Sequence, residues 1–188
     1  MNEHSKTEQY EKLILPHVAA AYNLARWLTR NDHDAEDVAQ DACIRAFRFF
    51  DGFHGSDARA WLLRIVRNTC YTWLQQNRAH DIVLTIDDAL DLPSSTYNPE
   101  TLVLQKLDYE QVAEAIEALP VEFREVIILR EMEGMSYKEI SEIIDIPIGT
   151  VMSRLARARR RIQTCLAEPK GSAPPIRNAT EKGIRHGL

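Results

Sequence analysis

Apolar residues recur along this chain at the three- and four-residue intervals of an α-helix. This period predicts helices over residues 8–30, 35–50 and 58–77, with Pro16 marking an early turn or kink in the first. The period returns over 101–118 and 121–133. Because no internal repeat and no strand-rich segment accompanies these helices, the pattern predicts an all-α fold.

Two stretches interrupt the succession of helices and divide the chain. Residues 79–100 show no sustained helical repeat, contain no lysine or arginine, and carry five acidic residues. The residues after 167 are rich in proline, glycine and charge. We therefore expect two small helical domains joined by a flexible linker. The expected bounds are 8–78 for the first domain, 79–100 for the acidic linker, 101–167 for the second domain and 168–188 for a disordered tail.

Residues 135–162 have the pattern of a helix, a tight turn and a second helix. Ser136, followed three residues later by Glu139, is a capping-box start, and three isoleucines then supply an apolar face. Pro147 interrupts the period, since proline is tolerated at the start of a helix but not inside one. The pattern predicts a helix-turn-helix at the end of the second domain.

The second helix of this motif carries side chains that suit DNA. Five arginines lie within the eight residues 154–161, and guanidinium groups bind phosphates and guanine edges in bidentate fashion. Short side chains at the N-terminal end of the helix can approach base edges closely. A solvated arginine-rich helix is the alternative for this segment alone. The capped helix and the turn in front of it favour DNA binding.

The charge of the chain is unusual for a nucleic-acid-binding protein. Its formal net charge is -5, whereas phosphate attraction usually demands a basic domain. The distribution matters more than the total, because the arginines gather on 45–78 and 154–161 while acidic residues occupy the linker. Such a chain would bind DNA weakly by itself and well inside a complex.

Composition limits the remaining classes of protein. No run of eighteen apolar residues exists and the N-terminus is polar, so we expect a soluble, cytoplasmic protein without membrane insertion. The three cysteines are widely spaced, the six histidines are scattered, and no catalytic motif is present. We therefore expect no enzyme activity, no cofactor and no metal ion.

Three further motifs stand in order along the chain. They comprise residues 34–41, residues 60–68, and a third set at 119–126 and 149–155. Together they resemble the bacterial sigma factors of the extracytoplasmic-function (ECF) group, within the sigma-70 family, over about residues 10–165. The resemblance implies two promoter-reading domains, binding to core RNA polymerase, promoter-specific transcription initiation and a role in stress response. It also implies an anti-sigma factor that holds the protein inactive.

The first motif places acidic and amide side chains on one helix face. Asp37, Gln40 and Asp41 lie within about one helical turn, while apolar neighbours point inward. Taken alone, these residues would suit a solvated helix N-terminus, where acidic side chains favour the helix dipole. The resemblance instead implies contacts with the polymerase β subunit and docking on the clamp helices of β′, the docking residues being Asp34, Asp37, Gln40 and Asp41.

The second motif follows an aromatic-rich stretch and a loop with two glycines. Aromatic stacking and guanidinium contacts can hold unpaired bases, and each stack contributes roughly 1–3 kcal/mol. We expect Phe47 and Phe50 in the core and structural roles for Trp61 and Trp73, whereas Phe53 is a candidate for a base pocket. The −10 contacts that the resemblance implies are Phe53, Arg59, Arg64, Arg67 and Asn68.

The third motif is similar to the part of the family that reads the −35 element. The contacts that the resemblance implies are Lys138, Thr150, Met152, Ser153, Arg154 and Arg157. Many members of the family carry a basic residue where this chain has Met152, a departure that predicts an altered −35 preference. If Arg154 reads a base edge, loss of its side chain should weaken binding to the −35 element by about 1–3 kcal/mol and relax the sequence preference at one position.

The linker adds a mechanical expectation. Promoter elements centred about two helical turns apart are separated by roughly 70 Å, whereas a compact chain of this length has a radius of gyration of about 16 Å. Residues 79–100 could span roughly 70–80 Å if extended. We expect polymerase to hold the domains apart and an anti-sigma factor to clamp them together.

A second function remains open at this stage. A dimeric helix-turn-helix regulator that acts without polymerase docking would explain residues 135–162. It would leave the motifs between 34 and 68 without a role.

Overall fold

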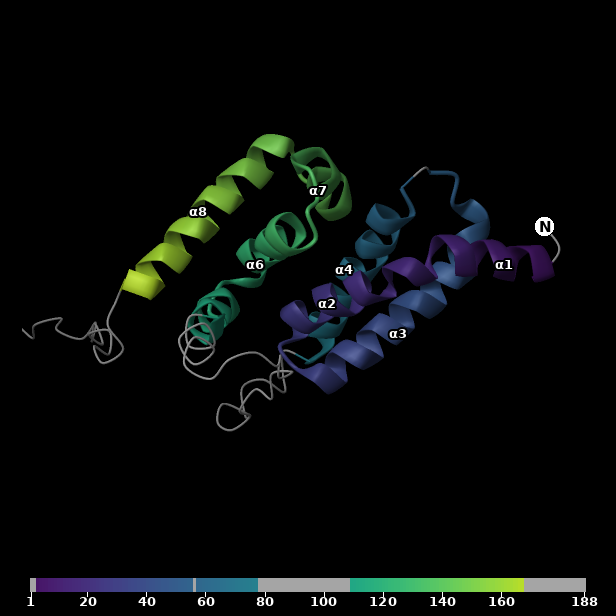
Figure 1. The fold of residues 1–188 in the computed structure, drawn as a ribbon, viewed down its shortest axis with the longest axis horizontal. Helices are drawn as coiled ribbons and strands as arrows, with labels where there is room; N and C mark the ends of the chain where they lie inside the picture. Colours follow the sequence, from purple (N-terminus) through teal and green to yellow (C-terminus); the bar gives the residue numbers. More distant parts are fainter. Residues whose placement is uncertain (1–2, 56, 78–108, 168–188) are drawn as a thin grey trace, which may run out of the picture.

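The computed structural model of the protein describes residues 3–55, 57–77 and 109–167. Within these ranges the regular structure is helical and contains no strand, so the predicted all-α fold is confirmed. Figure 1 shows two groups of helices, the N-terminal one in purple and blue and the C-terminal one in green and yellow. The predicted linker over 79–100 and tail over 168–188 lie outside the described residues.

The N-terminal group begins with a helix that proline interrupts. Helix α1 spans Glu3–Leu13, a 3-10 turn η1 spans Leu15–His17, and α2 spans Val18–Thr29. The helical period predicted over 8–30 is therefore divided by a turn at Pro16, where a turn or kink was expected. Pro16 lies inside the 3-10 turn, where its missing N–H ends one helix and its fixed φ starts the next.

The remaining N-terminal helices are α3 over Asp32–Phe49 and α4 over Ala58–Asn77. Asn31 caps α3, since its side-chain oxygen accepts a hydrogen bond from the Asp34 amide at 3.0 Å. The buried face of α3 consists almost entirely of alanines, which let the neighbouring helices approach closely. Leucines on α2 and α4 fill the space between the helices, as Leu24 and Leu62 are both fully buried.

Two aromatic predictions for the core have different outcomes. Phe50 is buried, with 4% of its surface exposed, as expected, but Phe47 is 38% exposed. The prediction for Phe47 is wrong because the edge of Tyr10 and the ammonium of Lys6 cover only part of its ring. Trp61 and Trp73 are partly buried and pack against the core.

The C-terminal group contains helical residues 109–117, α6 over Val121–Ile127, α7 over Tyr137–Ile144 and α8 over Ile148–Ala167. Between α6 and α7 the chain widens into a π-helical turn, η3, over Ile128–Met132. The predicted capping box is present, because Ser136 Oγ accepts from the Glu139 amide at 3.2 Å and the Glu139 carboxylate accepts from the Ser136 amide at 2.6 Å. The predicted helix-turn-helix is thus formed by α7 and α8.

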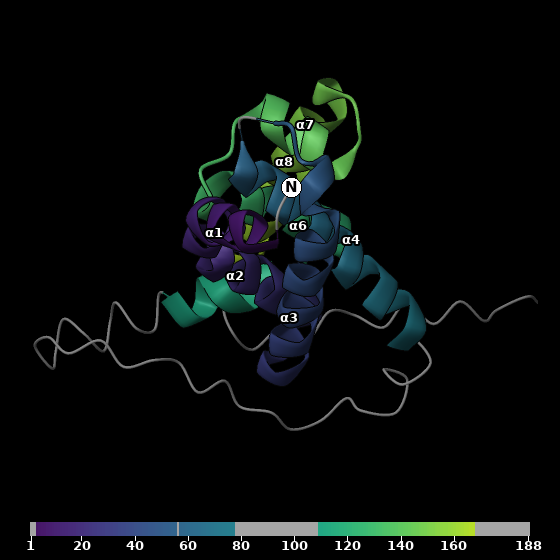
Figure 2. The ribbon, with the colours of Figure 1, turned by 90° about the vertical axis from the view of Figure 1, so that its right-hand side faces the viewer.

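The two groups of helices pack against each other. Figure 1 shows α6 beside α2 and α4, and Figure 2 shows α7 and α8 above the N-terminal helices. One continuous hydrophobic core includes residues of both groups, from Leu24 on α2 to Ile140 on α7. The structure therefore holds the two domains in a closed arrangement.

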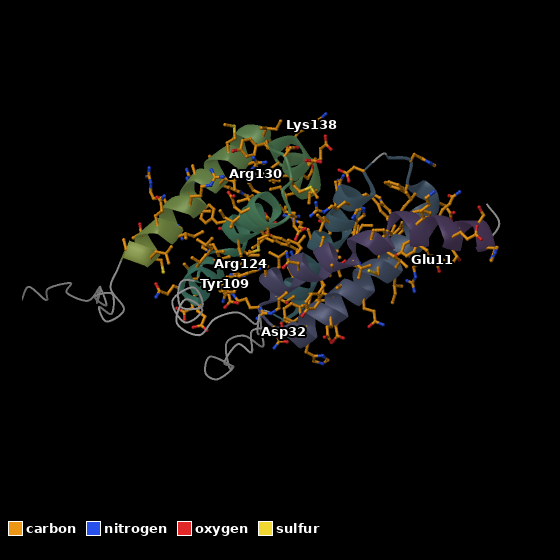
Figure 3. The ribbon with its side chains drawn as sticks, in the orientation of Figure 1. Glu11, Asp32, Tyr109, Arg124, Arg130 and Lys138 are labelled. Atoms are coloured by element: carbon orange, nitrogen blue, oxygen red, sulfur yellow. The ribbon has the colours of Figure 1, made fainter. Side chains whose placement is uncertain are left out.

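Arg124 ties the two groups together at the centre of their contact (Figure 3). Its guanidinium donates hydrogen bonds to the carbonyl oxygens of Trp27 at 2.9 Å, Glu117 at 2.8 Å and Leu119 at 2.7 Å. Burial lowers the pKa of Arg124 to about 10, so the side chain remains charged at neutral pH. A buried cation that is shared by backbone oxygens of both groups fixes how they meet.

Candidate polymerase-docking and DNA-binding surfaces

The acidic surface expected on α3 is present. Asp37 and Gln40 are exposed and Asp41 is half-buried, whereas Val38 beneath them is buried. Asp41 forms an ion pair with Arg45, one turn further along the helix, at 2.9 Å. Asp34 lies in the first turn, where the Asn31 cap holds its amide. The four residues therefore share one side of α3 near its start.

An apolar groove borders this acidic surface, and sequence reasoning missed it. Gln40 lines it together with Leu15, Ile44 and Phe47, and its volume is about 360 Å³. Ile44 is 45% exposed although the helical period placed it inward. The period alone cannot show that α2 and α4 cover only the alanine side of α3. Exposed apolar side chains beside carboxylates suit a protein partner.

An aromatic pocket lies at the loop before α4. The rings of Phe53 and Trp61 lie 4.9 Å apart, and Phe53 stacks on Phe50 at 6.1 Å. They form part of a pocket of about 370 Å³ that Arg64 also lines. Trp61, expected to be structural, is therefore also accessible to a ligand. No pattern in the sequence indicates that Trp61 also lines a pocket.

The other domain also lines this pocket. Glu142 and Ile143 of α7 contribute to its lining together with the aromatic residues. Four of the five predicted −10 residues follow along α4. Arg64 and Asn68 are exposed on this helix, whereas Arg59 and Arg67 are half-buried against the C-terminal group.

Five of the six predicted −35 residues are exposed or half-buried at the surface, and the sixth, Arg154, pairs with a buried carboxylate. Met152, Ser153 and Arg157 are exposed on α8 and Thr150 is half-buried at its start. Lys138 is exposed on α7, at the upper edge of the molecule in Figure 3. The remaining one, Arg154, turns toward the protein and lies 3.0 Å from the carboxylate of Glu125.

Glu125 connects a predicted −10 residue with a predicted −35 residue. Its side chain is fully buried, with Arg67 of α4 at 3.0 Å from one oxygen and Arg154 of α8 at 3.0 Å from the other. Burial raises the pKa of the Glu125 carboxyl, while Arg67, a hydrogen bond from Tyr71, and Arg154 act in the opposite direction. The Arg67 guanidinium also stacks on the Tyr71 ring at 4.0 Å. Sequence reasoning gave Glu125 no role.

A second glutamate of the C-terminal group also pairs with an arginine of α4. Glu133 follows η3 and is buried, and its carboxylate pairs with Arg59 of α4. It also accepts a hydrogen bond from Asn23 of α2 at 2.5 Å. Two of the predicted −10 arginines thus bind carboxylates of the C-terminal domain in this closed form.

Across residues 3–55, 57–77 and 109–167, no three histidine, cysteine, aspartate or glutamate side chains gather in a way that could hold a metal ion. No helix in the same ranges has the length and apolar character needed to cross a membrane.

Comparison with known proteins agrees with this geometry. The family model for sigma-70 region 2 matches residues 13–80, and the model for sigma-70 region 4 matches residues 109–162. The chain is 40% identical over 137 residues to the ECF RNA polymerase sigma-E factor of Escherichia coli K12, an alignment that covers 69% of this chain and 72% of that protein.

Two further relatives extend the comparison. The chain is 31% identical over 159 residues to the ECF RNA polymerase sigma factor SigE of Mycolicibacterium smegmatis, covering 85% of this chain and 62% of that protein. The fold of this chain is similar to that of the sigma factor RpoE of Bartonella quintana, whose structure was solved in complex with the anti-sigma factor NepR. The TM-score is 0.70 at 28% identity, over 85% of this chain and 97% of that one.

Two helical domains, the second carrying a helix-turn-helix, define the class of two-domain helical proteins with a helix-turn-helix module. The chain belongs to the ECF group of RNA polymerase sigma factors, within the sigma-70 family. Members of this family are transcription initiation factors.

Proposed function

We propose that this protein binds core RNA polymerase and directs it to promoters by reading a −10 element and a −35 element. One observation carries the proposal. The matches to sigma-70 region 2 and region 4 fall, in that order, on the helices that bear the aromatic pocket and on those that form the helix-turn-helix. In this proposal the domains divide as predicted, at 8–78 and 101–167, with the linker 79–100 between them and the tail 168–188 after them.

Polymerase docks on α3. Asp34, Asp37, Gln40 and Asp41 offer carboxylates and an amide to the β′ clamp helices. The neighbouring groove with Ile44 and Phe47 supplies apolar contact area, which acidic side chains alone would lack. The β subunit contacts the protein elsewhere.

The −10 element is held at the N-terminal end of α4. A non-template base leaves the duplex and stacks in the Phe53 pocket, while Arg59, Arg64, Arg67 and Asn68 bind the strand that follows. The support is geometric, because the pocket volume of about 370 Å³ and its two aromatic rings suit a planar base.

The −35 element is read by α8. Thr150, Met152, Ser153 and Arg157 lie on or near its solvent-facing side at the N-terminal end, which is the end that enters the major groove in a helix-turn-helix. Lys138 of α7 binds the phosphate backbone. Arg154 joins them once Glu125 releases it.

The protein itself performs no chemistry, because phosphodiester formation belongs to the polymerase. It acts in the cytoplasm, where polymerase and promoter DNA meet. An anti-sigma factor holds it inactive until an external stress releases it, as the complex of the similar RpoE with NepR suggests.

Run-off transcription with purified core polymerase tests this function. A library of promoters with randomised −10 and −35 elements should yield transcripts only when this protein is added. The alternative, a dimeric regulator, predicts a footprint on a palindrome by the protein alone and no dependence of transcription on it. Such a result would overturn the proposal.

A further inference from the structure

Gly55, in the loop before α4, lies against the ring of Phe53. A β-carbon added to Gly55 would stand 3.2 Å from Cε2, 3.8 Å from Cζ and 3.9 Å from Cδ2 of that ring. Real β-carbons seldom come as close as 3.2 Å to another residue, whereas 3.4–4 Å is ordinary van der Waals contact. The missing side chain of Gly55 therefore leaves room for one edge of the Phe53 ring.

The Phe53 ring has little freedom to give way. The Phe53 amide donates a hydrogen bond to the carbonyl oxygen of Phe50 at 2.9 Å, which anchors the backbone beneath the ring. The ring stacks on that of Phe50 at 6.1 Å and lies 4.9 Å from that of Trp61. Phe50 is buried, so its ring cannot retreat without disturbing the core. A methyl group on Gly55 would shift the Phe53 ring or the loop, and either shift changes the shape of the pocket.

Gly52 offers a comparison within the same loop. Both glycines are exposed and line the pocket that contains Phe53. Neither has a positive φ, since Gly134 is the one glycine with that conformation among the residues that the structure describes. A β-carbon on Gly52, however, would meet nothing within 4 Å. The backbone thus admits alanine at both positions, and the two glycines differ in their contact with the Phe53 ring.

We propose that Gly55 is a positioning residue for the base pocket. Because it lacks a side chain, the Phe53 ring already lies, before DNA binds, where an unpaired −10 base stacks. The inference rests on the proposed function, since it takes Phe53 as the residue that receives this base. A ring that is in place beforehand loses little conformational freedom when the base arrives, and such preorganisation strengthens binding. Gly55 acts through this ring.

The test is Gly55→Ala in the full-length protein, bound to core polymerase. The probe is a fluorescent single-stranded DNA with the non-template −10 sequence of a promoter selected in the run-off assay. We expect the affinity of the holoenzyme for this strand to fall by about tenfold, which is part of what a stacked base can contribute. Gly52→Ala is the matched control. It should weaken binding by less than about twofold, because its methyl group does not touch the ring.

A double variant separates positioning of the ring from a general effect on the loop. In a Phe53→Ala background the ring is gone, so Gly55→Ala should lower the affinity no further. Aromatic NMR spectra of the free protein follow the ring directly. The resonances that disappear in Phe53→Ala should shift in Gly55→Ala and shift much less in Gly52→Ala. Circular dichroism during thermal unfolding checks that each variant is folded.

Three results would overturn the inference. They are unchanged strand binding by Gly55→Ala, an equal loss of affinity with and without the Phe53 ring, and Phe53 resonances that do not move. Promoter-specific transcripts from the unsubstituted protein together with any of these results would reject the positioning role alone. A lack of such transcripts would reject the proposed function, and this inference with it.

Discussion

The guanidinium of Arg124, on α6, donates a hydrogen bond across the domain contact to the carbonyl oxygen of Trp27, on α2, at 2.9 Å. Two more carbonyl oxygens accept from the same side chain within the C-terminal domain. One buried side chain therefore organises the local turn around Pro120 and the meeting of the two domains.

Replacing this side chain should destabilise the fold. Arg124→Leu removes three charge-assisted hydrogen bonds and leaves buried carbonyl oxygens unpaired, so we expect the free energy of unfolding in urea to fall by about 2–4 kcal/mol. Arg160→Ala removes an exposed guanidinium and should change it by less than about 0.5 kcal/mol. Equal effects of the two substitutions would show that the carbonyl cluster around Arg124 adds little stability.

Charge reversal on α3 should weaken polymerase binding without affecting the fold. Asp37→Lys with Asp41→Lys breaks only the exposed pair with Arg45, and such pairs contribute about 0.3–0.5 kcal/mol. A pull-down with purified core polymerase should lose most of the complex. Glu11→Lys on α1 makes a single charge reversal away from α3 and should bind normally (Figure 3). Unchanged affinity of the double variant would count against docking at this surface.

Loss of the pocket ring should impair promoter melting. Phe53→Ala removes the ring that lies tilted against Trp61 at 4.9 Å, at a cost of roughly 1–3 kcal/mol for a stacked base. Permanganate footprints should lose open-complex signal, while initial duplex binding in a gel-shift assay changes little. Phe49→Ala provides the control, because Phe49 is 67% exposed and does not line the pocket. Similar defects in both variants would argue for a general effect of the aromatic stretch.

Arg154 and Arg157 should differ although both were predicted to bind the −35 element. Arg154→Ala leaves the buried Glu125 with one cation fewer, so it should lower stability by more than about 1 kcal/mol. The exposed Arg157→Ala should leave stability unchanged and cost about 1–3 kcal/mol at one −35 position if it reads a base. Thermal melts and transcription from −35 variants measure the two effects. A loss of equal size on all −35 sequences would instead make Arg157 a phosphate contact.

The capping box of α7 should make stability depend on pH. Hydrogen bonds with Ser136 lower the pKa of the Glu139 carboxyl in the folded protein. Stability from its charge is therefore complete above the unfolded pKa, near pH 4, and is lost as the pH falls through the lower folded value. Chemical denaturation should show Glu139→Gln less stable than the unsubstituted protein at pH 7, with the difference shrinking on acidification. In a Ser136→Ala background the substitution should have a smaller effect at pH 7.

Local features of this fold followed from the sequence. The capping box at Ser136 depends on residues within one turn, and their spacing is enough to predict it. At Pro16 the sequence predicted a turn or kink without deciding between them, and the structure has a turn. Local signals show that a helix is disturbed, but whether it resumes depends on what the next turn packs against.

Features that depend on distant residues could not be predicted in the same way. Glu125 contacts Arg67 across 58 residues and Arg154 across 29, so no window of sequence contains the arrangement. Ile44 and Phe47 were placed inward because a helical period shows which residues share a face but not how far the neighbours cover it. The candidate DNA contacts were predicted from residue type and from the family resemblance, whereas the pairing of three of these arginines with glutamates required the tertiary structure.

The continuous core that runs from α2 to α7 has a thermodynamic consequence. Parting the domains would bring hydrocarbon into contact with water, and hydration of such surface raises the heat capacity. The free energy of binding to the polymerase should then vary with temperature along a curve rather than a straight line. The sign of that curvature would show whether the polymerase covers the newly exposed apolar side chains or leaves them in contact with water.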